Sequence, residues 1–215
     1  MKTFQLGQDK ATGEIVDVKS VSSGLDCNCV CPSCGDDLVA VQGEQRRWYF
    51  RHYEKHDCER GYHKGLRVLA LQILRDNNYF YIPKYGRLSY KNIEIRRPFS
   101  DLPLTSDVVL DTKYFPVNLQ FKMTDEEEVG GYPGFEKAEI NLVEIDLTDY
   151  VYTTKEHFES YLLNNIDNKH IWSWQEGQRG EALQRITAKE NRPWVLGILG
   201  AGLAYALYRF LRSED

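Results

Sequence analysis

The chain of 215 residues lacks three features: an excess of positive charge, an export signal at its start, and any cysteine after residue 58. A formal net charge of −5 excludes a basic coat over the whole surface for gripping nucleic acid. The opening stretch Met1–Gln5 shows no signal-peptide pattern, and all five cysteines lie within residues 1–58. We therefore expect a reducing compartment, where clustered cysteines more often bind metal than form disulfides.

Composition and length favour a folded protein of modest size. An apolar content of 42% and a charged content of 27% are those of a globular chain and exclude a disordered one. The length allows one domain together with a small module. Charge is uneven, because residues 46–67 are locally basic and residues 125–149 are acidic. A locally basic face can bind phosphates, and the alternative is an ordinary solvated surface. The basic residues here include Arg46, Arg47, Arg51, Lys64 and Arg67.

The cysteines include a pair with the spacing of a zinc knuckle. Cys31 and Cys34 are separated by two residues and followed by Gly35. The tight turn lets both thiolates reach one ion, and glycine permits the positive φ that such a turn often needs. The partners are expected after a hairpin through residues 38–41 and 48–50. We predict Cys31, Cys34, His52 and Cys58 as zinc ligands, with Cys27, Cys29 and His56 as competitors for one of these places.

Two stretches, 106–108 and 117–123, are predicted to be adjacent strands that aim polar groups at a common point. Successive side chains on a strand point to opposite faces, so Asn118, Gln120 and Lys122 fall on one face of the second strand. Asp107, on the first of the two strands, adds a carboxylate. An acidic side chain near a lysine can hold a divalent cation and organise a water beside a phosphate. The alternative is an ordinary half-buried strand whose polar residues face solvent.

The remaining patterns predict two helices and further strands. Apolar residues recur every three or four positions over residues 59–77 and 154–166, which is typical of amphipathic helices. Strands are expected at 79–83, 88–95 and 139–147, and a short hairpin at 4–6 and 15–18. Glu59, His63 and Arg67 are spaced by four and line one polar stripe of the first helix. Trp172 and Trp174 are expected to close the domain by packing on the sheet.

The C-terminal segment, unlike the rest of the chain, contains a long run of uncharged residues. Sixteen residues from Pro193 to Tyr208 carry no charge, slightly fewer than the ~20 expected of a full membrane span. Snorkelling of Arg209 would extend the run to Leu211. Basic residues before it favour an anchor with the main domain in the cytoplasm, on the inner face of the membrane. The alternative is a buried or partner-binding helix. A small-residue face suited to helix packing and oligomer formation comprises Gly197, Gly200, Ala201 and Ala204.

The order of these motifs resembles a known family over residues 27–150. The Cys-Pro-x-Cys pair, the run Tyr49-Phe50-Arg51-His52, then Cys58, then Glu59 and His63 at a helix start, resembles the CoiA-like competence proteins. Asp107 and Gln120-x-Lys122 resemble the core of PD-(D/E)xK nucleases, the restriction-endonuclease-like fold to which that group belongs. The resemblance implies an α/β (α+β) fold with a mixed central sheet flanked by helices.

The resemblance also implies roles for individual residues. Asp107 matches the metal-binding aspartate and Lys122 the catalytic lysine, while Gln120 stands where Glu or Asp is usual. Asp107 and Gln120 would hold Mg²⁺ or Mn²⁺, with negative charge added by Glu59. Lys122 would position or help to deprotonate the attacking water. His63 would contact a phosphate or orient Glu59.

These expectations combine into one functional hypothesis and its competitor. The chain is expected to be a metal-dependent nuclease acting on DNA, in DNA uptake and processing or in defence against foreign DNA. Its domains would be a zinc-ribbon-like module (1–58), a nuclease domain (59–178), and a linker with a hydrophobic helix (179–215). Because an amide is a weaker ligand than a carboxylate for a hard cation, the competing hypothesis is an inactive nucleic-acid- or partner-binding module anchored at the membrane.

Overall fold

The computed structural model describes residues 4–45, 47–54, 58, 60–95, 106–124 and 140–174. The chain divides into two compact units, residues 1–175 and 176–215, and all of the described residues belong to the first. The hydrophobic helix predicted within 179–215 therefore lies outside the described residues. In the described part of the chain, no helix is both long and apolar enough to cross a membrane.

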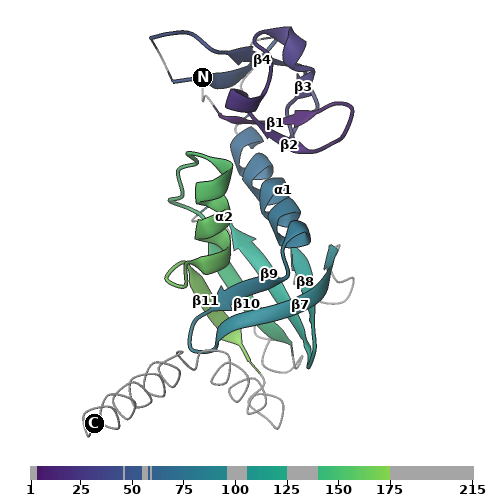
Figure 1. The fold of residues 1–215 in the computed structure, drawn as a ribbon, viewed down its shortest axis with the longest axis vertical. Helices are drawn as coiled ribbons and strands as arrows, with labels where there is room; N and C mark the ends of the chain where they lie inside the picture. Colours follow the sequence, from purple (N-terminus) through teal and green to yellow (C-terminus); the bar gives the residue numbers. More distant parts are fainter. Residues whose placement is uncertain are drawn as a thin grey trace, which may run out of the picture. The chain divides into compact units, whose positions relative to one another are not determined.

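The N-terminal part is a small all-β module with short 3₁₀ turns (Figure 1). One sheet has three antiparallel strands in the order β2-β1-β3, and a second consists of the antiparallel hairpin β4-β5. Phe4, Leu38 and Phe50 lie in its small hydrophobic core. The elements are β1 (Leu6–Asp9), β2 (Ile15–Asp17), η1 (Val18–Ser20), η2 (Leu25–Cys27), β3 (Cys29–Val30), β4 (Leu38–Val41) and β5 (Tyr49–His52).

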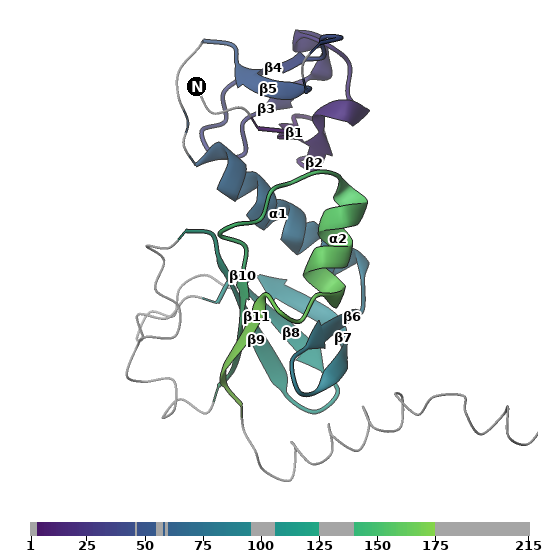
Figure 2. The ribbon, with the colours of Figure 1, turned by 90° about the vertical axis from the view of Figure 1, so that its left-hand side faces the viewer.

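The larger part is a six-stranded mixed sheet with two helices, which confirms the predicted α+β architecture (Figures 1 and 2). The strand order is β11-β10-β9-β8-β7-β6, and all neighbours are antiparallel except β9 and β10. Helix α1 contacts α2 and β7, and α2 contacts β6. The elements are α1 (Gly61–Asp76), β6 (Tyr79–Ile82), β7 (Gly86–Ile95), β8 (Val108–Thr112), β9 (Pro116–Lys122), β10 (Asn141–Asp146), α2 (Lys155–Asn164) and β11 (Lys169–Ser173).

Hydrophobic periodicity accounts for the central elements. On α1 the apolar residues spaced by three and four are buried, among them Leu66, Leu69 and Ile73. On β9 the alternating Leu119 and Phe121 are almost fully buried. The parallel pairing of β9 with β10 requires a crossover rather than a hairpin, and this connection runs through residues 123–140.

Some element boundaries differ from the sequence-based expectation, and one strand was not expected. Helix α1 begins at Gly61 rather than at residue 59, and β8 begins after Asp107 and continues to Thr112. Strand β11 was not predicted, because its short Lys169–Ser173 segment is half polar and is revealed only by its pairing with β10. Trp174 follows this strand and packs on residues of two strand connections, stacking on Tyr85 with ring centroids 4.8 Å apart and meeting Phe115 edge-on. Trp172, which was expected to pack on the sheet as well, is 41% exposed.

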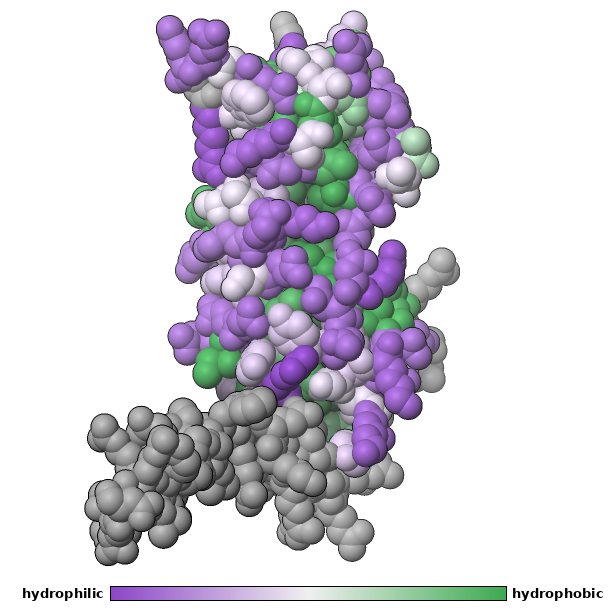
Figure 3. Space-filling model, viewed as in Figure 1, coloured by the Kyte–Doolittle hydropathy of each residue, from purple (hydrophilic) through white to green (hydrophobic). Residues whose placement is uncertain are grey.

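On the face shown in Figure 3, hydrophilic side chains predominate and the apolar ones form small separate patches. The large apolar side chains that are most exposed in the described residues lie on different elements. Apolar residues that are exposed singly are normal on a protein surface. They include Tyr53, Ile95, Val151 and Ile166.

A tyrosine network joins the N-terminal module to the segment that leads into α2. The Tyr62 hydroxyl on α1 donates to the Tyr150 carbonyl and accepts from the Tyr152 amide, both at 2.9 Å. The Tyr152 hydroxyl donates to Asp17 Oδ2 at 2.8 Å, and Arg47 Nη2 donates to the Tyr152 carbonyl at 2.7 Å. Tyr152 is 1% exposed, so its hydroxyl cannot bond to bulk water and needs Asp17 as its hydrogen-bond acceptor.

We predict that Tyr152→Phe lowers the free energy of unfolding by about 1.5–3 kcal/mol, the usual contribution of a hydrogen bond to a charged group. Urea unfolding measures the change. Tyr53→Phe is the matched control, because the side chain of Tyr53 is 56% exposed and should change stability little. In the double variant with Asp17→Asn the two losses should be less than additive. Full additivity would show that the two side chains do not interact.

Candidate functional site

The four cysteine and histidine residues predicted as zinc ligands lie together. Their ligand atoms are all within 4.8 Å of one another, so the group could hold a metal ion such as zinc. The Sγ atoms of Cys31 and Cys58 are 3.8 Å apart, and Cys34 Sγ lies 3.3 Å from His52 Nε2. Three thiols and one imidazole are a common tetrahedral zinc set.

Local backbone geometry explains how these ligands converge. Cys31 follows β3, and its carbonyl accepts from the amide of Gly35 at 2.9 Å, which closes the knuckle. Gly35 has φ +82°, a left-handed conformation that a side chain would strain. His52 is the last residue of β5, and Cys58 lies just before α1. The cluster therefore joins the knuckle, the β4-β5 hairpin and the start of α1.

The competing cysteines have other environments. Cys27 and Cys29 belong to the hydrophobic core of the module. The Sγ atom of Cys27 donates to the Leu38 carbonyl at 3.5 Å, and that of Cys29 to the Cys27 carbonyl at 3.0 Å. They act there as small buried apolar residues. The third competitor, His56, lies outside the described residues.

The environment shifts the pKa values of the cluster's thiols in different directions. Burial raises the pKa of Cys31, and it raises the pKa of Cys34 to about 12. At Cys58 burial also opposes ionisation, but hydrogen bonds with Ser33 and the neighbouring thiols lower the pKa overall. Since metal binds the thiolate, loading of the cluster releases protons.

We predict that the purified chain carries one metal ion that depends on these four residues. Cys34→Ser should weaken metal retention against a chelator at least about tenfold, because it removes one of the direct ligands. Metal content and competition with a chromophoric chelator measure this. The matched control is Cys29→Ala, which removes a buried thiol outside the cluster. Equal metal loss in both variants would contradict the assignment.

Asp107 is held at the point where β8 begins. Its amide donates to the Leu119 carbonyl at 2.9 Å, and its Oδ2 accepts from the Phe121 amide at 2.7 Å. The carboxylate thus takes the place that a backbone carbonyl of β8 would have beside β9. Arg67 Nε, from α1, lies 3.4 Å from Asp107 Oδ1, and Arg67 Nη2 donates to the Phe121 carbonyl at 3.1 Å.

Lys122 and Gln120 each have an acidic neighbour on β10. In the parallel register Gln120 pairs with Glu144 and Lys122 with Asp146. Lys122 Nζ lies 3.5 Å from Asp146 Oδ2. The contact described for the Lys122 ammonium is therefore with Asp146, and its predicted convergence with Asp107 stays a prediction. Within the described residues, no group of three His, Cys, Asp or Glu ligands includes Asp107.

The chain matches no family model, no curated protein and no solved structure. The resemblance to CoiA-like proteins and PD-(D/E)xK nucleases is therefore carried by the motifs alone.

The other predicted site residues are dispersed. His63 is half-buried, with its ring at 5.7 Å from that of Tyr62 in an edge contact, while Lys64 on the same helix is exposed. Arg51 is half-buried and donates to the His52 carbonyl. Glu59 and Arg46 lie outside the described residues.

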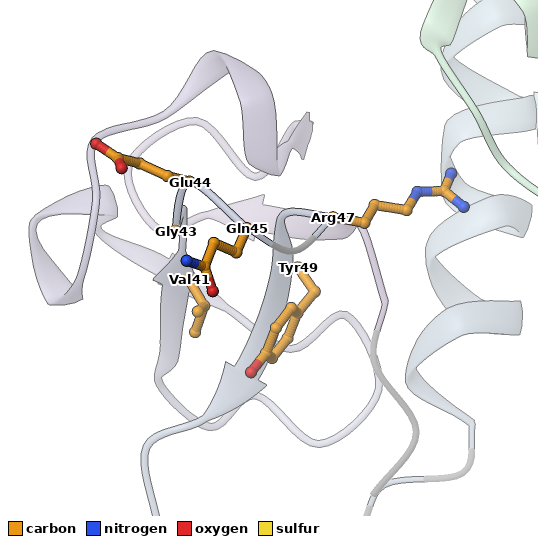
Figure 4. Close-up of a pocket in the computed structure, with 6 residues that line it drawn as sticks. All are labelled: Val41, Gly43, Glu44, Gln45, Arg47 and Tyr49. Atoms are coloured by element: carbon orange, nitrogen blue, oxygen red, sulfur yellow. The ribbon is translucent and has the colours of Figure 1, made fainter.

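A hollow of about 450 Å³ adjoins Arg47 on the β4-β5 hairpin (Figure 4). Its lining residues include Val41, Gln45 and Tyr49, whereas the Arg47 side chain points away from them, toward its bond with Tyr152. Arg47 therefore contributes to the contact between the module and the segment before α2.

Two buried polar residues of β10 and β11 were not predicted as site residues. Glu144 is 7% exposed and accepts from Trp172 Nε1 at 2.8 Å. Lys169 is 6% exposed, hydrogen-bonds to the Asn165 carbonyl and lies over the Phe80 ring. Burial lowers the pKa of Lys169 to about 7. Glu144 lies on a strand that the sequence predicts, but its partner Trp172 and the buried Lys169 both lie on β11, for which the sequence offers little signal.

Asp146 supplies a pH-dependent contribution to stability. Burial opposes its ionisation, but hydrogen bonds from Thr148 and the charge of Lys122 outweigh burial and lower the pKa of Asp146 below its ordinary 3.8. Because the folded-state pKa is below the unfolded one, the stabilisation is present above about pH 4 and is lost as pH falls through the folded value.

We predict that Asp146→Asn flattens the loss of stability below about pH 4, the range set by an ordinary aspartate pKa. Urea unfolding as a function of pH measures the slope. The exposed Asp149 provides the control, since Asp149→Asn should keep the wild-type slope. A wild-type slope in Asp146→Asn would mean that this carboxylate is not stabilised by folding.

Proposed function

We propose that this chain is a metal-dependent nuclease that hydrolyses phosphodiester bonds of DNA. The observation that supports the proposal best is the position of Asp107. Its carboxylate is fixed at the start of β8 against Phe121, which lies between Gln120 and Lys122 on the adjacent strand. A carboxylate beside such a segment, with a carbonyl oxygen nearby, matches the oxygen ligands that Mg²⁺ and Mn²⁺ prefer.

Each residue has a distinct role in this proposal. Asp107 and Gln120 hold the ion, which when bound polarises the phosphate and stabilises the leaving oxyanion. Lys122 orients the attacking water, and Asp146 holds the Lys122 side chain in place from the neighbouring strand. Glu59, which precedes α1 in the sequence, would supply a further negative charge, and His63 in the first turn of α1 would contact the phosphate.

The N-terminal module has a structural and a binding role. Zinc at the Cys/His cluster fixes the start of α1, from which Lys64 projects into solvent. Basic side chains here would contact the nucleic-acid backbone, with affinity that depends on salt and little on sequence. Tethering by the C-terminal segment to the inner face of the cell membrane would place this activity where foreign DNA enters.

A second candidate is a binding module without turnover. The observation that favours it is the pairing of both principal catalytic residues with other charges. Asp107 is paired with Arg67, and Lys122 with Asp146. Together with the amide of Gln120, these pairs would suit a site that retains the fold and binds nucleic acid but no catalytic ion.

We predict that the purified chain nicks plasmid DNA with Mg²⁺ or Mn²⁺, and that Asp107→Ala and Lys122→Ala each lower the rate at least about a hundredfold, the usual cost of losing one direct catalytic group. The controls are Asp111→Ala and Lys113→Ala, which alter exposed residues of the same strands and turn. Gel analysis of plasmid conversion gives the rates. Equal cleavage by all five proteins would identify a contaminating nuclease.

The second candidate gives a different outcome in the same preparation. It predicts no cleavage by the wild type, but retention of DNA that weakens with salt and is reduced by Lys64→Glu. Charge reversal at Arg47 is unsuitable here, because its bond to Tyr152 would be lost as well.

A further inference from the structure

Arg67 occupies the space between two oxygen atoms of the proposed site. Its Nε lies 3.4 Å from Asp107 Oδ1, and its Nη2 donates to the Phe121 carbonyl at 3.1 Å. The guanidinium therefore bridges a carboxylate on one strand and a main-chain carbonyl on the next. The second carboxylate oxygen of Asp107 accepts from the Phe121 amide, and this bond keeps Oδ1 directed at the guanidinium.

This pair of oxygens is a donor set for a hard cation. A carboxylate and a carbonyl on adjacent strands are the ligands that Mg²⁺ and Mn²⁺ take. In the structure the positive charge between them is that of Arg67. A divalent ion and a guanidinium repel each other, so the two cations cannot occupy this place together.

The Arg67 side chain has partial access to solvent. It is 31% exposed, while that of Asp107 is 17% exposed, so the guanidinium borders solvent on one side of the pair. Lys64 is exposed three residues earlier on the same helix, and residues three apart are neighbours on a helix surface. A phosphate group held by Lys64 would therefore lie within reach of Arg67. Arginine binds phosphate through the same fork of N–H groups with which it binds a carboxylate.

We propose that Arg67 is an internal cation that fills the metal position of this chain until a nucleic-acid phosphate draws it away. The proposal rests on the proposed nuclease function, and it adds that metal binding is coupled to substrate. Without DNA, Arg67 neutralises Asp107 and excludes the ion. With DNA, Arg67 moves to the phosphate, and Asp107 and the Phe121 carbonyl become available. By linkage, DNA and the metal ion then strengthen each other's binding.

The first part of the proposal, exclusion of the ion by Arg67, is tested by Mn²⁺ binding to the full chain whose cysteine cluster has been loaded with zinc. Isothermal titration and the electron paramagnetic resonance signal of free Mn²⁺ both report binding, independently of cleavage. Arg67→Gln should bind Mn²⁺ at least about tenfold more tightly than the wild type, because a positive charge next to the ion has been removed. The control is Arg75→Gln, which removes an exposed arginine in the last turn of the same helix and should leave the affinity unchanged.

Two further measurements connect this effect to Asp107 and to DNA. Adding Asp107→Asn to Arg67→Gln should abolish the gain in Mn²⁺ affinity. A DNA duplex with cleavage-resistant phosphorothioate linkages should tighten Mn²⁺ binding in the wild type but not in Arg67→Gln. Arg67→Lys keeps the charge but cannot bridge both oxygens, so its Mn²⁺ affinity should lie between those of the wild type and Arg67→Gln.

The outcomes separate this proposal from the nuclease function. Unchanged or weaker Mn²⁺ binding in Arg67→Gln, with an intact thermal transition, would assign Arg67 a purely structural role and overturn the proposal even if the wild type cleaves DNA. If Arg67→Gln does not fold, Arg67→Lys takes its place, and unchanged or weaker Mn²⁺ binding in that variant overturns the proposal. Equal tightening by DNA in the wild type and in Arg67→Gln would overturn the phosphate-driven exchange. A gain in Mn²⁺ affinity that requires Asp107, without cleavage by any variant, would support the exchange and reject the nuclease.

Discussion

The Cys/His cluster lies next to the start of α1, and α1 carries side chains that reach the sheet. Cys58 is one of the four residues that could hold a metal ion, and it lies three residues before the first residue of the helix. At 1.5 Å per residue, the six positions from Gly61 to Arg67 correspond to roughly 9 Å along the axis. Tyr62 is fixed between them by its bonds to Tyr150 and Tyr152. The module therefore positions the guanidinium that meets Asp107.

Two ion pairs lie where β8 begins and where β9 and β10 end. The side chains of Lys122 and Asp146 are 24% and 43% exposed, and those of Arg67 and Asp107 are 31% and 17% exposed. Pairs with substantial solvent access usually contribute between 0 and about 1 kcal/mol to stability. The proposed exchange requires the pair of Arg67 and Asp107 to open, and a substrate phosphate and a metal ion would be partners of the required charge.

Local patterns in the sequence were sufficient for the metal cluster and for most elements, but not for the charge pairing. The knuckle of Cys31 and Cys34 and the periodicity of α1 follow from spacing alone. The partners of Lys122 and Arg67 depend on the parallel register of β9 with β10 and on the approach of a helix, neither of which is encoded locally. Strand β11 was not predicted for the same reason, because its sequence has only a weak alternation of apolar and polar residues and its pairing with β10 is what makes it a strand.

The same register gives a physical reason for glutamine at position 120. Gln120 lies directly beside Glu144 on the neighbouring parallel strand, where strands are about 4.8 Å apart. Glu144 is 7% exposed and already accepts from Trp172. A carboxylate at position 120 would add a second negative charge next to a buried one, which is strongly unfavourable without a bound cation. An amide at position 120 avoids this repulsion.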